Sequence, residues 1–159
     1  MFTKSYWCFP FLLLFCLFAQ AESKLDEDLL NDIKKSVAIN DGDILYIDFW
    51  ASWCNPCRKS FPWMNSMIEK YEAQGFKILA INVDKDKNLA EQFLASVESR
   101  FPILYDPQGR FANEFKLKGM PSSFIIDSHG AVLAAHKGFF ENKLAVYENE
   151  IESHLNKQP

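Results

Sequence analysis

Two cysteines, Cys54 and Cys57, stand three residues apart in the run WCNPC (residues 53–57). An apolar stretch, residues 44–50, precedes them and predicts a buried strand, and the residues after them have helical spacing. A cysteine at a helix N-terminus faces unpaired backbone N–H groups and the positive end of the helix dipole, which favour the thiolate. The spacing also brings Cys57 within reach of a mixed disulfide on Cys54. We therefore predict thiol–disulfide exchange in which Cys54 attacks and Cys57 resolves.

Two other uses of this pair are structural. A disulfide that closes so short a ring removes little entropy from the unfolded chain, so it would stabilise the fold weakly. A zinc site would need two further ligands. Beyond residue 21 the chain has only three histidines, which are predicted to be surface residues on a turn, a strand and a helix: His129, His136 and His154. The context of the pair therefore favours redox chemistry over a structural disulfide or a metal site.

The N-terminal segment, residues 1–21, has the composition of a signal sequence. Lys4 is its only charged residue, residues 11–18 are an apolar run, and the segment ends on the small-residue pattern Ala-Gln-Ala at Ala21. Cleavage after Ala21 would leave a single domain, residues 22–159, whose size suffices for a hydrophobic core.

Two alternatives remain for this segment. It could be retained as a membrane anchor, because residues 5–21 are uncharged, although Pro10 interrupts them. A lipoprotein site at Cys16 is weaker, because the bulky Phe15 precedes it. Each alternative places the domain outside the cytoplasm.

Charge and hydropathy exclude other classes of function. The chain has 17 basic and 21 acidic residues and a net charge of −4, so no basic surface for nucleic acid is expected. Beyond the first segment, no apolar run approaches the roughly 18 residues of a spanning helix. The predicted domain is soluble.

The elements that must position the cysteines alternate along the chain. An α/β fold with a mixed sheet follows, with a right-handed crossover after the first strand and a hairpin around residues 128–130. A capping box starting at Ser23 is expected to open the first helix. Helices are predicted at 23–37, 55–71, 88–97, 111–116 and 140–155, and strands at 44–50, 77–83, 101–105, 123–127 and 131–136.

Three segments carry a resemblance to a known family: residues 47–57 around the cysteines, Pro62, and the run GMPSSF at residues 119–124. With them the chain resembles the thioredoxin superfamily over residues 43–155, and most closely its extracytoplasmic TlpA-like and DsbE-like branch. The resemblance implies a thioredoxin fold, which is a central mixed β-sheet flanked by helices. In this branch an inserted helix and strand precede the cis-proline.

The resemblance also assigns roles around the cysteines. Pro121 matches the cis-proline beside the active site, and a cis bond is favourable only before proline. Met120 would offer backbone hydrogen bonds to a substrate chain. Pro62 would kink the active-site helix, because it removes an intrahelical hydrogen bond. The candidate docking surface comprises Trp53, Gly138 and Phe139, together with Trp50, which could equally be core.

Asp48 matches the family's buried acid beneath the active site. Desolvation would raise its pKa, so that it could transfer a proton to and from Cys57. The alternative is an inward-facing polar residue satisfied by hydrogen bonds. Where cytoplasmic thioredoxins place a lysine, this chain has Ala80, so the carboxyl group should be still harder to ionise.

The direction of electron flow is predicted from the two residues between the cysteines. Proline precedes Cys57, as in reducing family members, and the histidine of strongly oxidising members is absent. We expect a reductase of protein disulfides in the bacterial periplasm, recycled by a membrane electron donor, with cytochrome c maturation as the best-attested use in the family. The alternatives are a disulfide-forming oxidase or isomerase, and a copper-binding dithiol module using Met120. No cofactor, metal or nucleic acid is implied, and a monomer is the default.

Overall fold

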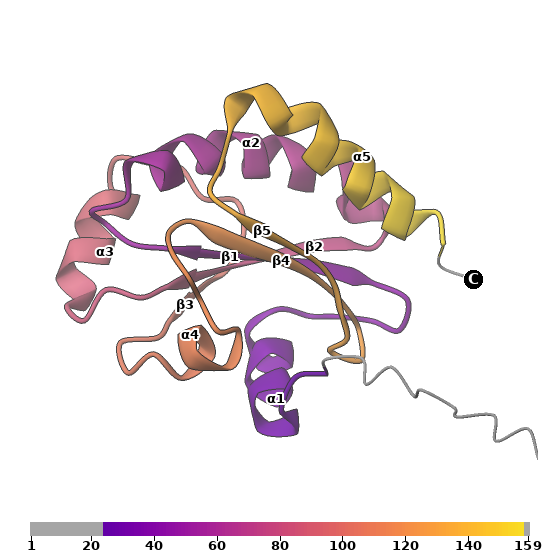
Figure 1. The fold of residues 1–159 in the computed structure, drawn as a ribbon, viewed down its shortest axis with the longest axis horizontal. Coiled ribbons are helices and arrows are strands. Elements are labelled where there is room, and N and C mark those ends of the chain that lie inside the picture. The colour runs from indigo at the N-terminus through magenta and orange to yellow at the C-terminus, as the bar shows by residue number, and fades with distance from the viewer. Residues whose placement is uncertain (1–23, 158–159) are drawn as a thin grey trace, which may run out of the picture.

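The structure, a computed structural model, describes residues 24–157, in which a mixed sheet lies between two layers of helices (Figure 1). The strands are β1 (Ile44–Trp50), β2 (Phe76–Asn82), β3 (Ile103–Tyr105), β4 (Ser122–Asp127) and β5 (Val132–Lys137). The helices are α1 (Glu27–Ser36), α2 (Asn55–Tyr71), α3 (Lys87–Leu94), α4 (Arg110–Glu114) and α5 (Leu144–Leu155), with 3-10 turns η1 (Glu72–Gln74) and η2 (Glu141–Lys143).

The sheet has five strands in the order β3-β2-β1-β4-β5. The first three strands of the chain are parallel to one another, whereas β4 runs antiparallel to both β1 and β5. Helices α2 and α5 cover one face, and α1 and α4 lie against the other (Figure 1). The predicted α/β class is confirmed, as are a crossover through α2 between the parallel strands β1 and β2 and the hairpin of β4 and β5.

Strand β1 lies at the centre of the sheet and is buried along its whole length. Tyr46 and Trp50 pack into the cluster beneath α2 and α5, whereas Ile47 and Phe49 pack into the cluster on the opposite face. Successive side chains on a strand alternate between faces. Asp48 is therefore on the face that α2 covers.

The start of α1 differs from the prediction. Asp26 is the N-cap, and its side chain accepts hydrogen bonds from two backbone N–H groups of the first turn. Lys24 forms an isolated β-bridge with Ala131, so the chain is still extended there. Ser23, the predicted first residue of a capping box, and the predicted signal sequence at residues 1–21 lie outside the described residues.

Helices α3, α4 and α5 are also shorter than predicted, and α4 covers only Arg110–Glu114. Helix α3 ends at Leu94 because the backbone N–H and the hydroxyl of Ser96 both donate to the carbonyl of Phe93. Helix α5 begins at Leu144 rather than residue 140, because Phe140 has an extended backbone and a 3-10 turn follows it.

The active-site helix is continuous past Pro62, which confirms that this proline lies inside a helix rather than at its boundary. Gly75 ends the segment with a φ of +89°. A Cβ at this position would lie 2.8 Å from Oδ1 of Asp43, so both the backbone angle and the space require glycine. The chain can therefore turn at once into β2.

Candidate active site

The two cysteines lie at the start of α2, as predicted, and are joined by a disulfide with their Cα atoms 5.3 Å apart. Cys54 is the N-cap, and its Sγ accepts a hydrogen bond from the backbone N–H of Cys57 at 3.3 Å. Cys54 is 4% exposed and Cys57 is fully buried. The N–H groups of the helix start therefore favour a thiolate at Cys54, and Cys54 is the sulfur that a partner can reach.

A buried carboxylate holds the loop between β1 and α2. Asp84 accepts hydrogen bonds from the backbone N–H of Ser52 at 2.8 Å, the hydroxyl of Ser52 at 3.0 Å and the side chain of Asn82 at 2.9 Å. These bonds join the loop after β1 to the end of β2, and Trp53 in the same loop is 68% exposed. Sequence reasoning missed Asp84; its signal was an acid placed just after a buried strand.

Asp48 is 2% exposed, and burial raises the pKa of its carboxyl group well above the ordinary value. Its neighbours across the sheet are Ala80 on β2 and Ser123 on β4. Within residues 24–157, its Oδ2 has no hydrogen-bond partner. Asp48 is therefore buried as predicted, and its part in proton transfer stays a prediction.

The loop before β4 contains the predicted cis bond, between Met120 and Pro121. Pro121 is buried, and Met120 is half-buried against the hydrophobic clusters on both faces of the sheet. The carbonyl of Pro121 accepts a hydrogen bond from the backbone N–H of Gly138 at 2.8 Å. The end of β5 is thereby fixed beside the cis-proline loop.

A groove of about 430 Å³ lies beside the first turn of α2. Phe139 contributes to it, but its ring also packs against Trp63 at 5.7 Å. Phe140 is 49% exposed and was missed by sequence reasoning, although the adjacent pair of phenylalanines was a signal. An ion pair of 2.8 Å between Lys59 and Glu141 joins α2 to the segment after β5. The groove is lined by Asn55, Pro56, Lys59, Phe139, Phe140, Glu141 and Asn142.

Trp50 does not belong to this surface, which corrects one candidate docking residue. Its side chain is fully buried, and its ring lies 5.3 Å from Phe61 and 4.6 Å from Phe93. The reason is the period of β1, which directs this residue toward the layer under α2. Of the two tryptophans near the cysteines, only Trp53 is available to a partner.

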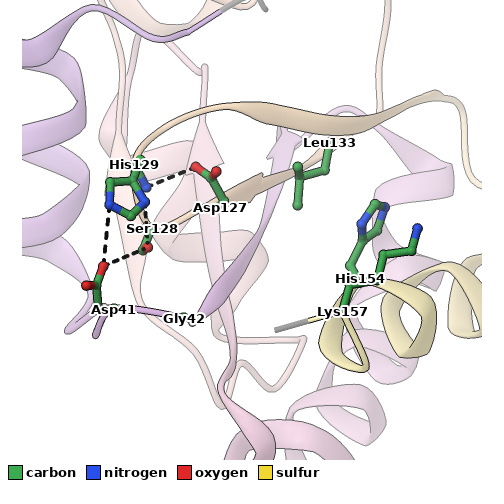
Figure 2. A pocket seen from close by; sticks show the side chains of 8 residues that line it. All are labelled: Asp41, Gly42, Asp127, Ser128, His129, Leu133, His154 and Lys157. Carbon is green, nitrogen blue, oxygen red and sulfur yellow. Dashed lines mark hydrogen bonds and ion pairs between the residues drawn. The ribbon is translucent and has the colours of Figure 1, made fainter. Parts of the chain in front are cut away.

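A second hollow lies at the far end of the sheet, between the β4–β5 turn and the end of α5 (Figure 2). Asp127 accepts hydrogen bonds from two backbone N–H groups of that turn, and the exposed His129 lies 3.5 Å from Asp41. Asp127 pairs with Ile44, at the opposite end of β1 from the cysteines. This hollow is therefore separate from the candidate active site.

The histidines are not all surface residues. His129 is exposed as predicted, whereas His136 and His154 are half-buried. His136 packs its ring against Tyr147 and lies next to Glu150 on α5. The prediction of a surface position is wrong for His136, because α5 covers this part of β5.

The fold and the disulfide at the start of α2 define a thioredoxin-like protein with a C-x-x-C pair. The chain belongs to the Redoxin family, whose sequence profile matches residues 23–151. It is 33% identical over 114 residues to the thiol-disulfide oxidoreductase ResA of Geobacillus kaustophilus, a match that covers 72% of this chain and 62% of the relative. The chain thus spans about three fifths of the length of the first curated relatives it matches.

Solved structures of thiol-disulfide proteins are also similar to this chain. A Chlorobium tepidum structure, assigned as a thiol:disulfide interchange protein DsbE, is 46% identical with a TM-score of 0.70, over 72% of this chain and 81% of that chain. The thioredoxin domain of a Bacteroides vulgatus thiol-disulfide oxidoreductase is 18% identical with a TM-score of 0.60, over 80% of this chain and 82% of that chain. The second likeness concerns the fold alone. The predicted thioredoxin fold and the likeness to the DsbE-like branch are confirmed.

Proposed function

We propose that this protein is a thiol–disulfide oxidoreductase that exchanges electrons with protein disulfides and dithiols through Cys54 and Cys57. The observation that carries the proposal is the disulfide between Cys54, the N-cap of α2, and Cys57 in the first turn of that helix. The names of the relatives, which are thiol-disulfide oxidoreductases and a thiol:disulfide interchange protein, support it.

In the reducing direction, the Cys54 thiolate attacks one sulfur of a substrate disulfide. The other substrate sulfur leaves with the electron pair and takes a proton from water. Cys57 then loses its proton to Asp48, and its sulfur attacks the Cys54 sulfur. The mixed disulfide breaks, the remaining substrate sulfur leaves as a thiolate, and two electrons have passed from the protein to its substrate.

The docking surface of this proposal surrounds Cys54. Trp53 provides an exposed ring, and the backbone of Met120 pairs with an extended substrate segment. Gly138 and Phe139 contribute the edge beside the cis-proline loop, and the exposed Phe140 extends it. Protein substrates therefore contact three loops that are distant in sequence.

The direction and the location are further parts of the proposal. The residues between the cysteines, Asn55 and Pro56, support a reductase that a membrane donor recycles, and cytochrome c maturation is its proposed use. Within the described part of the chain, no helix is long and apolar enough to cross a membrane. A bacterial periplasmic location rests on the composition of residues 1–21.

The test is reduction of insulin by the protein with dithiothreitol as electron source. The wild type is expected to accelerate insulin precipitation, and Cys54→Ser to abolish the effect. Cys57→Ser that is reduced beforehand and mixed with insulin without dithiothreitol should instead accumulate a mixed disulfide, visible by non-reducing electrophoresis, because the resolving sulfur is missing.

The direction is tested by the equilibrium potential of the pair in glutathione buffers. A reductase should have a potential near that of thioredoxin, about −270 mV, whereas about −120 mV is typical of a strong oxidant. The latter value would overturn the reductase and leave the oxidoreductase proposal in place. Equal insulin reduction by wild type and Cys54→Ser would overturn the activity itself.

A further inference from the structure

Three side chains form a row across the sheet that begins at Asp48. Asp48 on β1 lies opposite Ser123 on β4, and Ser123 lies opposite His136 on the edge strand β5. Residues directly opposite in antiparallel strands share a face and have Cα atoms about 4.5–5.5 Å apart. The row therefore leads from the buried centre of the sheet to its edge in about 10 Å.

Tyr46 lies beside this row, on β1 opposite Ile125. It lies two residues before Asp48 on the same face of β1 and is nearly fully buried. Burial, and after it the charge of Asp48, raises the pKa of Tyr46, and the Ser123 side chain opposes the rise. Ser123 thus stands between the buried acid and the edge strand, and the phenol of Tyr46 lies beside it.

The outer end of the row is an acid–base pair. Nε2 of His136 lies 2.8 Å from Oε2 of Glu150 on α5, and the side chains of these residues are 22% and 31% exposed. The imidazole also meets the ring of Tyr147 at 5.0 Å. The titratable groups that face His136 are thus Glu150 and Tyr147 from α5, and beyond Ser123 in the sheet, Tyr46 and Asp48. Solvent reaches this end of the row and hardly reaches the other.

A second observation concerns unsatisfied polar atoms. Within residues 24–157, the buried side-chain nitrogen and oxygen atoms without a hydrogen-bond partner all belong to the layer between the sheet and the α2–α5 pair. Buried polar atoms are satisfied in most proteins, by internal water where no protein group is available. Asp48 Oδ2 and His136 Nδ1, at the two ends of the row, therefore each have a bonding position that a water molecule can fill. The atoms are Asp48 Oδ2, Trp50 Nε1, Trp63 Nε1 and His136 Nδ1, and Glu150 Oε2 has no contact besides its ion pair with His136.

We propose that His136, paired with Glu150, exchanges with solvent the proton that Asp48 takes from Cys57. The proton passes along the hydroxyl groups of Ser123 and Tyr46 and the water between them. The inference rests on the proposed function, because it needs Asp48 to act as the base. His136 does not touch the reacting sulfur atoms. Its part is to pass the proton between Asp48 and solvent.

The proton balance of this step is simple. When Cys57 attacks the mixed disulfide, its proton moves to Asp48, and the Cys54–substrate bond breaks. Asp48 must return to its ionised form before the next turnover, so it passes the proton outward to His136, which releases it to water. When the Cys54–Cys57 disulfide is reduced again, Cys57 takes up a proton along the reverse route.

The experiment compares His136→Gln with wild type in single-turnover reduction of insulin, in weakly buffered solution from about pH 5.5 to about pH 9. The variant should slow resolution of the mixed disulfide about fivefold, less than the 10²–10⁴-fold typical of a direct acid or base. Added imidazole should restore the rate, because it carries the proton instead. In an Asp48→Asn background, His136→Gln should have no further effect.

His154→Gln is the matched control, since His154 is also half-buried but lies on α5 outside the row, and it should react like wild type. Glu150→Gln is a second variant of the pair and should give a smaller slowing with the same rescue. Thermal unfolding of each variant reports whether it is folded.

The outcomes separate the two proposals. If Asp48→Asn is slow but His136→Gln and Glu150→Gln match wild type at every pH, the proton path is wrong and the proposed function stands. His136→Gln could also resolve the mixed disulfide slowly without rescue by imidazole, and slow it further in the Asp48→Asn background. That result would mean that His136 has a structural role, and it would also overturn the proton path. If Asp48→Asn itself matches wild type, the role of Asp48 in the proposed function fails, and the path fails with it.

Discussion

Asp48 is the residue at which stability and the proposed chemistry oppose each other. Its carboxyl group is buried in the folded protein, which raises its pKa well above the ordinary 3.8 that it has in the unfolded chain. Between these two pKa values the folded state binds more protons than the unfolded state. The contribution of this carboxyl group to the free energy of unfolding is therefore largest below about pH 4. It decreases as the pH rises toward the pKa that the group has in the folded protein.

This fall in stability with rising pH should disappear when Asp48 is replaced by a residue that does not ionise. Asp48→Asn should raise the free energy of unfolding of the oxidised protein at pH 8, by about 1.4 kcal/mol for each pH unit over which the folded carboxyl group stays protonated. The gain should vanish near pH 4. Urea unfolding at several pH values measures it, with Asp41→Asn, at an 89% exposed side chain, as the control. A gain independent of pH would contradict the account.

At the scale of elements, the loop from β1 to α2 depends on β2. Asp84 gathers donors from that loop and from Asn82 at the end of β2, and it is only 6% exposed. Removal of this acceptor leaves buried donors unpaired. The position of the Cys54 backbone is thereby tied to an element that contributes no reactive group.

We expect Asp84→Ala to destabilise the protein by about 2–4 kcal/mol, because several hydrogen bonds to a charged group are lost together. Asp86→Ala is the control: this residue caps α3 at an exposed position, and its loss should cost about 1 kcal/mol. Chemical unfolding measures both. The first variant should also reduce insulin more slowly while it remains folded, and equal unfolding free energies for the two would count against this role of Asp84.

At the scale of the whole molecule, the surface around Cys54 is assembled from the starts of α2, β4 and the segment after β5. Phe140 lies above Gly138, where a Cβ would come within 2.9 Å of its ring. The glycine has a φ of +81° and allows the aromatic ring to lie close to the loop beside the cis-proline. An exposed apolar ring in this position is suited to contact with a protein substrate.

Phe140→Ala is therefore expected to raise KM for insulin about tenfold, the loss typical of one aromatic contact in an interface. The rate with a small disulfide such as hydroxyethyl disulfide should stay unchanged, because it does not reach the groove. Val146→Ala, at a 59% exposed position on α5 outside the groove, provides the control. An equal effect of Phe140→Ala on both substrates would argue against a docking role.

Several features followed from local patterns alone. The run of apolar residues in β1 indicates a strand buried on both faces, and the spacing of Cys54 and Cys57 after it indicates a redox pair at a helix start. These signals are local because strand burial and helix capping depend on residues within a few positions of one another. The start of α1 at Asp26 was harder to predict, since several adjacent polar residues can serve as a cap.

Pairing between distant segments accounts for the remainder. Asp48, Ser123 and His136 are far apart in the chain and meet in one row only because β4 inserts antiparallel between β1 and β5 in that register. A shift of one residue would turn a strand's side chains to the other face. The burial of Trp50 likewise depends on the face of β1 that it occupies, whereas Trp53 lies in the turn after β1 and is exposed. Residue type and spacing therefore indicated the redox chemistry of the cysteine pair. Strand register, and the packing of helices on each face of the sheet, determined which residues surround the pair.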